Sequence, residues 1–207
     1  MATVFHYISD IATRAVSNPD TYTAIICASG ISDFSIFERF ANATSLTCTN
    51  LNLASLTNIS KLPWLTNLNC SRNKLFTLDD LHALTNLTTL NASYNNIITL
   101  KALSSCTSLI DINVDDNYIT SPSGLECCSC LMKLSCRLNK LVTLRGLHRN
   151  TMLVKLYCSW NDLITIHDIT NCKSLKILDC SYNKIITLGA VANLALEQLH
   201  YTGNPIQ

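Results

Sequence analysis

The stretch LYCSWNDL (residues 156–163) returns as LDCSYNKI at residues 178–185. Both copies share Leu, Cys, Ser and Asn at the same offsets, and both place a large aromatic residue, Trp160 or Tyr182, directly before the Asn. An apolar residue at every second position is typical of a short strand with one inward face. The pair therefore predicts a repeated unit of strand and turn, and a search for further copies decides the fold.

The unit recurs along most of the 207 residues. Its central strand position keeps a 22-residue period, with a last step that is one residue shorter, through Leu46, Leu68, Leu90, Ile112, Leu134, Leu156, Leu178 and Leu199. An asparagine follows five residues later from the second clear unit onward, at Asn73, Asn95, Asn117, Asn139, Asn161, Asn183 and Asn204. The first clear unit has Leu51 near this place, and an imperfect earlier unit fits the register through Ala24, Ile26, Ile31 and Phe34. No unit can bury its apolar side alone, so the units must stack into a solenoid.

The pattern L-x-x-L-x-L/C-x-x-N-x-L resembles the leucine-rich repeat. With phrases such as LTNLTTL before the strand, it resembles the short-repeat class that includes the leucine-rich-repeat regulatory subunit of protein phosphatase 1, axonemal dynein light chain and internalins. The resemblance implies an α/β fold, a right-handed solenoid with a concave parallel β-sheet. Apolar residues three apart predict a convex side that is mostly 3-10 or irregular. We expect the aligned asparagines to bond to backbone groups at the turns.

The chain divides at about residue 20. Val4, Ile8, Ile11 and Ala15 form one apolar stripe of a helix, which Asn18-Pro19-Asp20 would end. Residues 1–20 are therefore predicted as an N-terminal capping helix, with a partner-binding helix as the alternative, because solenoid ends need covering. Residues 21–207 are predicted as the leucine-rich-repeat solenoid, with about eight repeats.

Composition excludes several classes of partner. The net charge of +1 gives no general attraction to nucleic acid or acidic lipid, and no apolar run is long enough to span a membrane. The first residues lack the pattern of a secretory signal, and eleven cysteines, an odd number, favour free thiols over a disulfide framework. We expect a cytoplasmic monomer, with the nucleus and the cytoskeleton as alternative locations. The five N-x-S/T triplets are interpreted as accidental.

The cysteines and histidines do not form a catalytic pattern. Five cysteines occupy the inward strand position and three share a second apolar register: Cys48, Cys70, Cys136, Cys158 and Cys180, then Cys106, Cys128 and Cys172. Cys127 and Cys130 are left as surface thiols, with a zinc site that includes His148 as the alternative. No nucleotide, nucleophile or metalloprotease motif is present. We therefore predict no enzyme activity, cofactor or metal.

Function is expected on the outward residues of the strands. Aromatic residues and arginine are enriched where truncation weakens protein interfaces most. The predicted protein-binding residues on the concave face are Tyr94, Asp111, Asp115, Lys133, Arg137, Lys155, Tyr157, Trp160, Asp179 and Tyr182. The alternative is that these charges pair with one another and the aromatic rings only shield backbone.

The resemblance implies a regulatory scaffold, with a phosphatase or a cytoskeletal motor as its target. A secreted or surface adhesion module similar to an internalin is the second possibility. The third is the substrate-recognition part of a larger enzyme.

Overall fold

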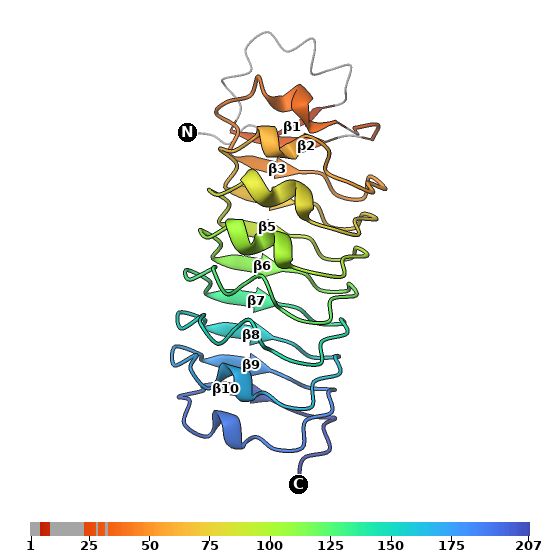
Figure 1. Cartoon of the computed structure of the whole chain (residues 1–207). Coiled ribbons are helices and arrows are strands. Elements are labelled where there is room, and N and C mark those ends of the chain that lie inside the picture. The colour runs from red at the N-terminus through yellow and green to blue at the C-terminus, as the bar shows by residue number, and fades with distance from the viewer. Residues whose placement is uncertain (1–4, 9–22, 28, 32) are drawn as a thin grey trace.

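The chain winds into an elongated stack with one strand per turn (Figure 1). The computed structural model describes residues 5–8, 23–27, 29–31 and 33–207. Their ten strands form one parallel sheet in chain order. The strands are β1 (Phe5–Ile8), β2 (Ala24–Cys27), β3 (Ser45–Thr47), β4 (Asn67–Asn69), β5 (Thr89–Asn91), β6 (Asp111–Asn113), β7 (Lys133–Ser135), β8 (Lys155–Tyr157), β9 (Ile177–Asp179) and β10 (Gln198–His200).

The sheet register follows the repeat. Leu134 lies opposite Leu156, and Leu156 lies opposite Leu178. The shorter last step holds as well, because Leu199 lies opposite Leu178. From β3 to β9 the central residue of each strand is buried in a single continuous core. The predicted leucine-rich-repeat architecture is confirmed.

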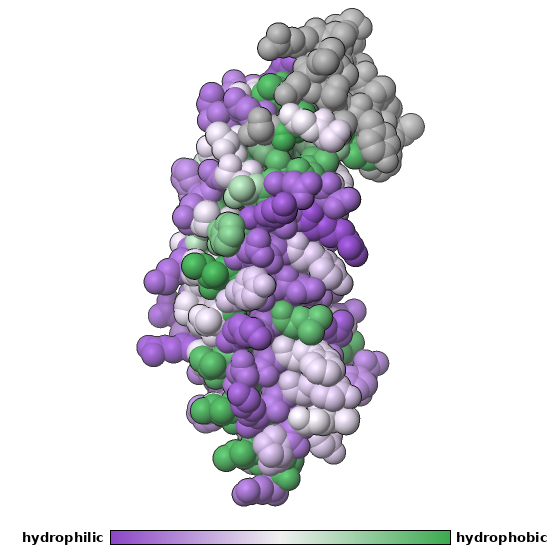
Figure 2. All heavy atoms as spheres, turned by 90° about the vertical axis from the view of Figure 1, so that its right-hand side faces the viewer, coloured by the Kyte–Doolittle hydropathy of each residue, from purple (hydrophilic) through white to green (hydrophobic). Residues whose placement is uncertain are grey.

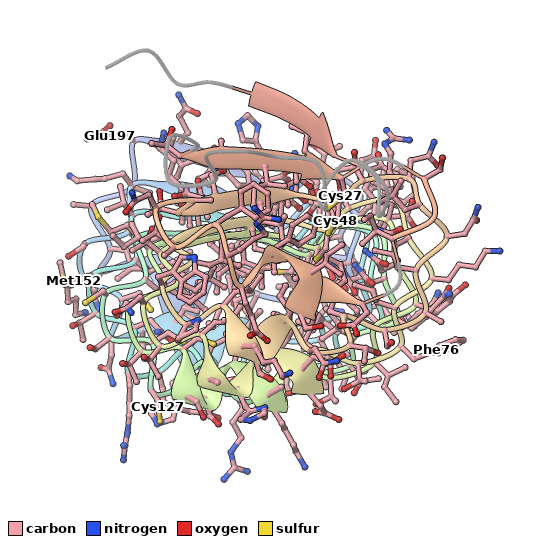
Figure 3. The ribbon with its side chains drawn as sticks, turned by 90° about the horizontal axis from the view of Figure 1, so that it is seen from above. Cys27, Cys48, Phe76, Cys127, Met152 and Glu197 are labelled. Carbon is pink, nitrogen blue, oxygen red and sulfur yellow. The ribbon has the colours of Figure 1, made fainter. Side chains whose placement is uncertain are left out.

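Short 3-10 helices cover the side of the core opposite the strands (Figure 3). In the unit after β4, Leu78, Leu81 and Leu84 are buried at the predicted spacing of three. The helices are η2 (Phe34–Phe37), η3 (Ile59–Lys61), η4 (Asp79–Ala83), η5 (Lys101–Ser105), η6 (His167–Ile169) and η7 (Gly189–Val191). The predicted 3-10 or irregular return segments are confirmed.

The repeated asparagines join neighbouring units. The Asn139 side-chain oxygen accepts from the Ile119 N–H (3.0 Å), and its amide donates to the carbonyls of Val114 (2.9 Å), Cys136 (3.2 Å) and Arg137 (3.0 Å). Equivalent bonds are made by Asn73, Asn95, Asn117, Asn161 and Asn183. Without the ladder the buried Ile119 N–H would lack a partner, and the carbonyls of Val114 and Cys136 are shared between neighbouring asparagines of the ladder. The predicted asparagine ladder is confirmed.

The units without a 3-10 helix turn at glycine. Gly124 and Gly146 have φ values of +109° and +120°. A Cβ atom on Gly124 would lie 2.3 Å from the Leu100 carbonyl oxygen, and one on Gly146 would lie 2.7 Å from the Pro122 carbonyl oxygen. Only glycine fits this left-handed, tightly packed turn.

The predicted register of the earliest unit is wrong by one residue. Ala24 lies opposite Ser45 and Ile25 opposite Leu46, so Ile25 and Cys27 point inward in place of Ala24 and Ile26. A slip of one residue exchanges the two faces of a strand. The observed register buries more apolar volume and aligns Cys27 with the inward cysteines that follow.

The N-terminal segment begins with a strand where a helix was predicted. Phe5–Ile8 is β1, and it pairs in parallel with β2. Phe, Tyr and Ile favour strands, and the open edge of β2 offers backbone groups for pairing. The remainder of the predicted helix, residues 1–4 and 9–20, lies outside the described residues.

Candidate protein-binding face

The sheet side that points away from the core, here called the open face, carries the predicted binding residues in columns. Asp111, Lys133 and Lys155 are the first residues of consecutive strands. Tyr157 and Asp179 are the last residues of β8 and β9. Asp115 and Arg137 follow two residues after their strands, and Tyr94, Trp160 and Tyr182 follow three residues after theirs.

Several charges on the open face pair with each other. The Lys133 ammonium lies 2.9 Å from the Asp111 carboxylate. Asp115 accepts from the Ser135 hydroxyl and from the Arg137 backbone N–H, both at 2.7 Å. Pairing of opposite charges across strands therefore holds for Asp111 and Lys133. Asp115 is held in place by two neutral donors.

Arg137 joins three successive units of the open face. Its guanidinium lies 4.4 Å from the centre of the Tyr157 ring and donates to Asp179 at 3.3 Å. The Arg137 Nε is buried and has no hydrogen-bond partner within the described part of the chain. An arginine stacked on a ring and paired to a carboxylate has its planar group fixed in orientation.

Asp179 is held as a carboxylate by its neighbours. It accepts from the Ser159 hydroxyl (3.0 Å) and from the Ser181 N–H (3.2 Å). Partial burial raises its pKa, but the bonds from Ser181 and Ser159 and the charge of Arg137 outweigh burial, so the pKa lies below its ordinary value. The Arg137–Asp179 pair thus stays charged at neutral pH.

A column of bulky residues adopts left-handed backbone conformation just after the strands. The φ values lie between 53° and 58° for Arg72, Tyr94, Asp116, Leu138, Trp160 and Tyr182. Such a conformation is uncommon outside glycine and costs roughly 1–3 kcal/mol per residue. Asparagine or glycine would fit at lower cost, as Asn50 and Gly203 do in the same column. The column therefore holds large side chains at a cost to stability, which points to a surface role.

The aromatic members of this column are ordered by stacking. The rings of Trp160 and Tyr182 are parallel within 16°, with 4.1 Å between centroids. Gly203 follows beneath them, where an added Cβ would approach the Tyr182 ring to 2.6 Å. Farther up, the Arg72 guanidinium lies 4.5 Å from the Tyr94 ring.

Two shallow hollows flank the Trp160–Tyr182 stack. One, of about 280 Å³, lies on the open face and is lined by Arg137, Tyr157, Asp179 and His200 together with the two stacked rings. The other, of about 380 Å³, lies along the turns that follow the strands and includes Leu138 and the same rings. The stack is a ridge between two concavities, the shape that an interface anchor needs.

The structure gathers half of the predicted residues into one cluster. Arg137, Tyr157, Trp160, Asp179 and Tyr182 are here named the arginine–aromatic cluster. Tyr94 lies three units away from Trp160 against Arg72, and Lys155 is exposed at the first position of β8. Leu138, which is 48% exposed, was missed because a leucine in a leucine-rich repeat reads as core.

No disulfide joins any of the eleven cysteines, all of which lie in the described part of the chain, and nine of them are buried. Burial raises the pKa of Cys70 and Cys180 to about 12 and that of Cys158 well above its ordinary value. Such thiols are poor nucleophiles at neutral pH. Cys127 and Cys130 are exposed, as predicted. Across the described residues, no group of three or more His, Cys, Asp or Glu side chains is placed to hold a metal ion.

Known proteins match this chain in fold and not in sequence. No protein-family profile matches the sequence. No curated protein matches it. Among solved structures, an internalin (inlF) of Listeria monocytogenes superimposes with a TM-score of 0.83 at 21% identity, over 90% of this chain and 56% of that one. The fold is the leucine-rich-repeat solenoid.

Two further solved structures share this solenoid. Internalin C2 of Listeria monocytogenes gives a TM-score of 0.81 at 23% identity, over 86% of this chain and 80% of that one. A leucine-rich-repeat protein of Leptospira interrogans gives 0.86 at 22% identity, over 97% of this chain and 53% of that one. The chain thus spans about half the length of two of these proteins. At such identities the likeness concerns the fold.

Within the described residues, none of the helices has the length and apolar character required to cross a bilayer.

Proposed function

We propose that this leucine-rich-repeat solenoid is a non-catalytic protein-binding module, and that its partner docks on the concave open face at the arginine–aromatic cluster. The observation that carries the proposal is the Trp160–Tyr182 stack. Both rings are exposed, and both residues adopt the costly left-handed backbone conformation. Rings already fixed in place lose little conformational freedom when a partner binds. Trp, Tyr and Arg are also the residue types that dominate binding energy in interfaces.

The binding test compares a double variant with the unaltered chain. Tagged protein is used to isolate partners from native lysate, and recovered partners are then titrated in purified form. Trp160→Ala with Tyr157→Ala is expected to weaken binding by about 2 kcal/mol or more, roughly 30-fold. Met152→Ala is the matched control. Met152 has nearly the same exposed fraction as Trp160, and it lies on the edge of the solenoid opposite Phe76 (Figure 3). A partner that binds the double variant normally would refute this location.

Tyr94→Ala maps the extent of the interface. Tyr94 matches Tyr182 in backbone conformation and exposure but lies four units earlier. A loss confined to the arginine–aromatic cluster places the partner over β7–β9. A loss at Tyr94 as well extends the contact to β5, and with it to the remaining predicted residues Asp111, Asp115, Lys133 and Lys155.

The finer assignment is a regulatory subunit in the cytoplasm that acts on a phosphatase or a cytoskeletal motor. Free thiols support a reducing compartment. Titration with a purified protein phosphatase 1 catalytic subunit tests the first target. Fractionation of cells with an antibody to the chain tests the location.

The second candidate is a surface adhesion module, which the likeness to two internalins favours. It requires that the chain be exported. Side chains of two N-x-S asparagines, Asn69 and Asn91, already bond to Ser71 and Ser93, so they are poorly placed for glycosylation. Intact mass under non-reducing conditions separates the candidates, because only an exported chain would carry disulfides or glycans.

A further inference from the structure

The lateral edge next to the strand ends carries an exposed apolar row that the fold does not need. Its members, here named the lateral row, recur in the register of the repeat and are 53–60% exposed: Phe76, Ile98, Val142, Ile164 and Ile186. Thr120 fills the one remaining place in the series. Figure 2 looks onto this edge and shows apolar side chains one below another along its margin. Apolar side chains that gather on a surface mark an interaction site.

The row is fixed in space by backbone bonds between units. Two residues before each member stands a second column, here named the lateral polar row: Lys74, Asn96, Tyr118, Lys140, Asp162 and Lys184. The N–H of each from Asn96 onward donates to a carbonyl of the preceding unit, for example Tyr118 to Ile97 at 2.9 Å and Lys184 to Leu163 at 2.8 Å. The five steps from Phe76 to Ile186 extend over about 24 Å at the strand spacing of about 4.8 Å. Both rows are therefore preorganised.

Within two units on either side of Thr120, the lateral row carries apolar residues at matching positions, whereas Ile186, three units on, matches Ala54. Ile98 and Val142 stand one repeat period on either side of Thr120, and Phe76 and Ile164 stand two periods on either side. A second copy placed antiparallel, about a two-fold axis at Thr120, thus sets Phe76 against Ile164 and Ile98 against Val142. Such self-matching is what an isologous interface requires.

The same two-fold operation brings no like charges together in the lateral polar row. The two-fold operation sets Lys74 opposite Asp162, Asn96 opposite Lys140, and Tyr118 opposite its own copy. This column then contains no pair of like charges. An axis shifted by one unit to Val142 would set Lys140 against itself and Thr120 against Ile164. Charge and apolar matching therefore favour the axis at Thr120 over the axis at Val142.

Asp162 already has a partner in its own chain. The Lys184 ammonium lies 2.7 Å from the Asp162 carboxylate, and both side chains remain partly exposed. A carboxylate has two oxygens and can accept from more than one donor. Asp162 can therefore receive Lys74 of the second copy without releasing Lys184.

We propose that the lateral edge is a homodimer interface, in which two copies pack antiparallel about a two-fold axis through Thr120. The occupant is a second copy because the edge is complementary to itself in both rows. Its length of about 24 Å suits an interface of standard size, which buries about 800 Å² per partner. The lateral polar row borders the hollow that Trp160 and Tyr182 also line. The cross-linking and sedimentation tests below use no partner protein, so they decide this proposal apart from the function proposed above.

Engineered disulfides test the axis directly. A disulfide requires Cα atoms within about 7 Å, so a single cysteine joins two copies only close to the axis. In a background with Cys127→Ser and Cys130→Ser, mild oxidation of Thr120→Cys should give at least tenfold more covalent dimer than Ile164→Cys. Phe76→Cys with Ile164→Cys should cross-link again. Equal cross-linking of the two single variants would overturn the proposal.

Sedimentation velocity over a wide concentration range tests the association itself. The unaltered chain should approach twice its mass of 22.9 kDa. Ile98→Asp should weaken dimerisation at least tenfold, whereas Met152→Asp on the opposite edge should leave it unchanged (Figure 3). Lys74→Glu should weaken it, and adding Asp162→Lys should restore it, with circular dichroism verifying the fold. A chain that stays monomeric at every concentration, or that instead sediments with phosphatidylserine vesicles, overturns the proposal.

Discussion

The indole of Trp160 lies flat against the phenol ring of Tyr182, 4.1 Å from centroid to centroid, and both residues have left-handed backbone. A stacked aromatic pair contributes about 0.5–1.5 kcal/mol beyond its burial. The two backbone conformations cost roughly 1–3 kcal/mol each. The stack therefore does not compensate fully for its own backbone. Asparagine or glycine would adopt this backbone at lower cost, so the two rings are not placed there by stability alone.

Leu138→Asn should stabilise the protein. Leu138 has φ of 53° and is 48% exposed, and asparagine accepts that conformation more easily. We expect a gain of about 0.5–1 kcal/mol in the free energy of unfolding by urea. Met132→Asn is the control, because Met132 is similarly exposed without a positive φ. A loss at Leu138 would show that its side chain contributes packing that outweighs the strain.

Asn139→Ala should destabilise the solenoid strongly. The change removes four hydrogen bonds and leaves the buried Ile119 N–H unpaired. The three carbonyls each lose one donor but keep another, from Asn117, Asn161 or the Asp116 N–H. One unpaired buried group costs about 1–3 kcal/mol and each of the three other lost bonds about 1 kcal/mol, so the expected loss is about 3 kcal/mol or more. Asn96→Ala is the control, since Asn96 stands outside the ladder. A loss at Asn139 below about 1 kcal/mol, the worth of a single bond, would contradict this account of the ladder.

Gly124→Ala should be far more harmful than Gly189→Ala. The new Cβ at Gly124 would lie 2.3 Å from a backbone oxygen, in a left-handed turn. At Gly189 the nearest atom is 3.6 Å away, and φ lies outside the left-handed region. We expect a fall of several degrees or more in the melting temperature of the first variant and little change in the second. Similar melting temperatures would mean that the turn relaxes freely.

The Arg137–Asp179 pair should make stability depend on pH in acid. The folded state lowers the pKa of Asp179 below its ordinary value of 3.8. Its contribution is therefore complete above that value and is lost as the pH falls through the lower folded pKa. The difference in unfolding free energy between the unaltered chain and Asp179→Asn should shrink on acidification below about pH 4. A difference that stays constant down to about pH 2 would contradict the assignment.

Two thiols should react quickly in the folded protein. Cys127 and Cys130 are exposed, whereas the other nine are buried. Burial raises the pKa of Cys70, Cys128 and Cys180 to about 12, which further suppresses the reactive thiolate. Intact mass after brief alkylation should show two adducts, and denatured protein should show eleven. Rapid labelling of Cys158 in the folded protein would contradict its burial and would indicate a reactive thiol.

The repeat period was enough to predict the columns of the fold. A constant step from unit to unit assigns inward leucines and cysteines, the asparagine ladder and outward Tyr157 and Asp179 without coordinates. It fails where the period slips, as between Ile25 and Leu46, whose separation is one residue short of the period. It also fails for Phe5–Ile8, which has no partner unit of equal length and pairs only because β2 presents an open edge.

Contacts within the candidate site lay beyond sequence reasoning. Arg137 and Asp179 are separated by nearly two full repeats, and their contact depends on a side chain that crosses the intervening strand. The left-handed backbone conformation at Trp160 and Tyr182 depends on the turn that follows each strand.

Asn150 is a polar residue in a core column that otherwise holds apolar residues and cysteines. Its amide donates to the carbonyls of Leu125 and Cys128, and its side-chain oxygen lacks a partner in the described structure. A polar residue in that column departs from the pattern that the period predicts.

The left-handed column has an evolutionary consequence. Its side chains leave the backbone outside the core and the asparagine ladder, so an exchange affects only neighbours in the column, as where Trp160 stacks on Tyr182 and Arg72 on Tyr94. Arg, Tyr, Asp, Leu, Trp and Tyr succeed each other there, while the inward positions stay almost uniform. The inward positions of the repeat thus specify the fold, while this column accepts different residue types. Gene duplication of a unit copies the scaffold and adds one exposed position whose side chain can change together with the residue stacked on it.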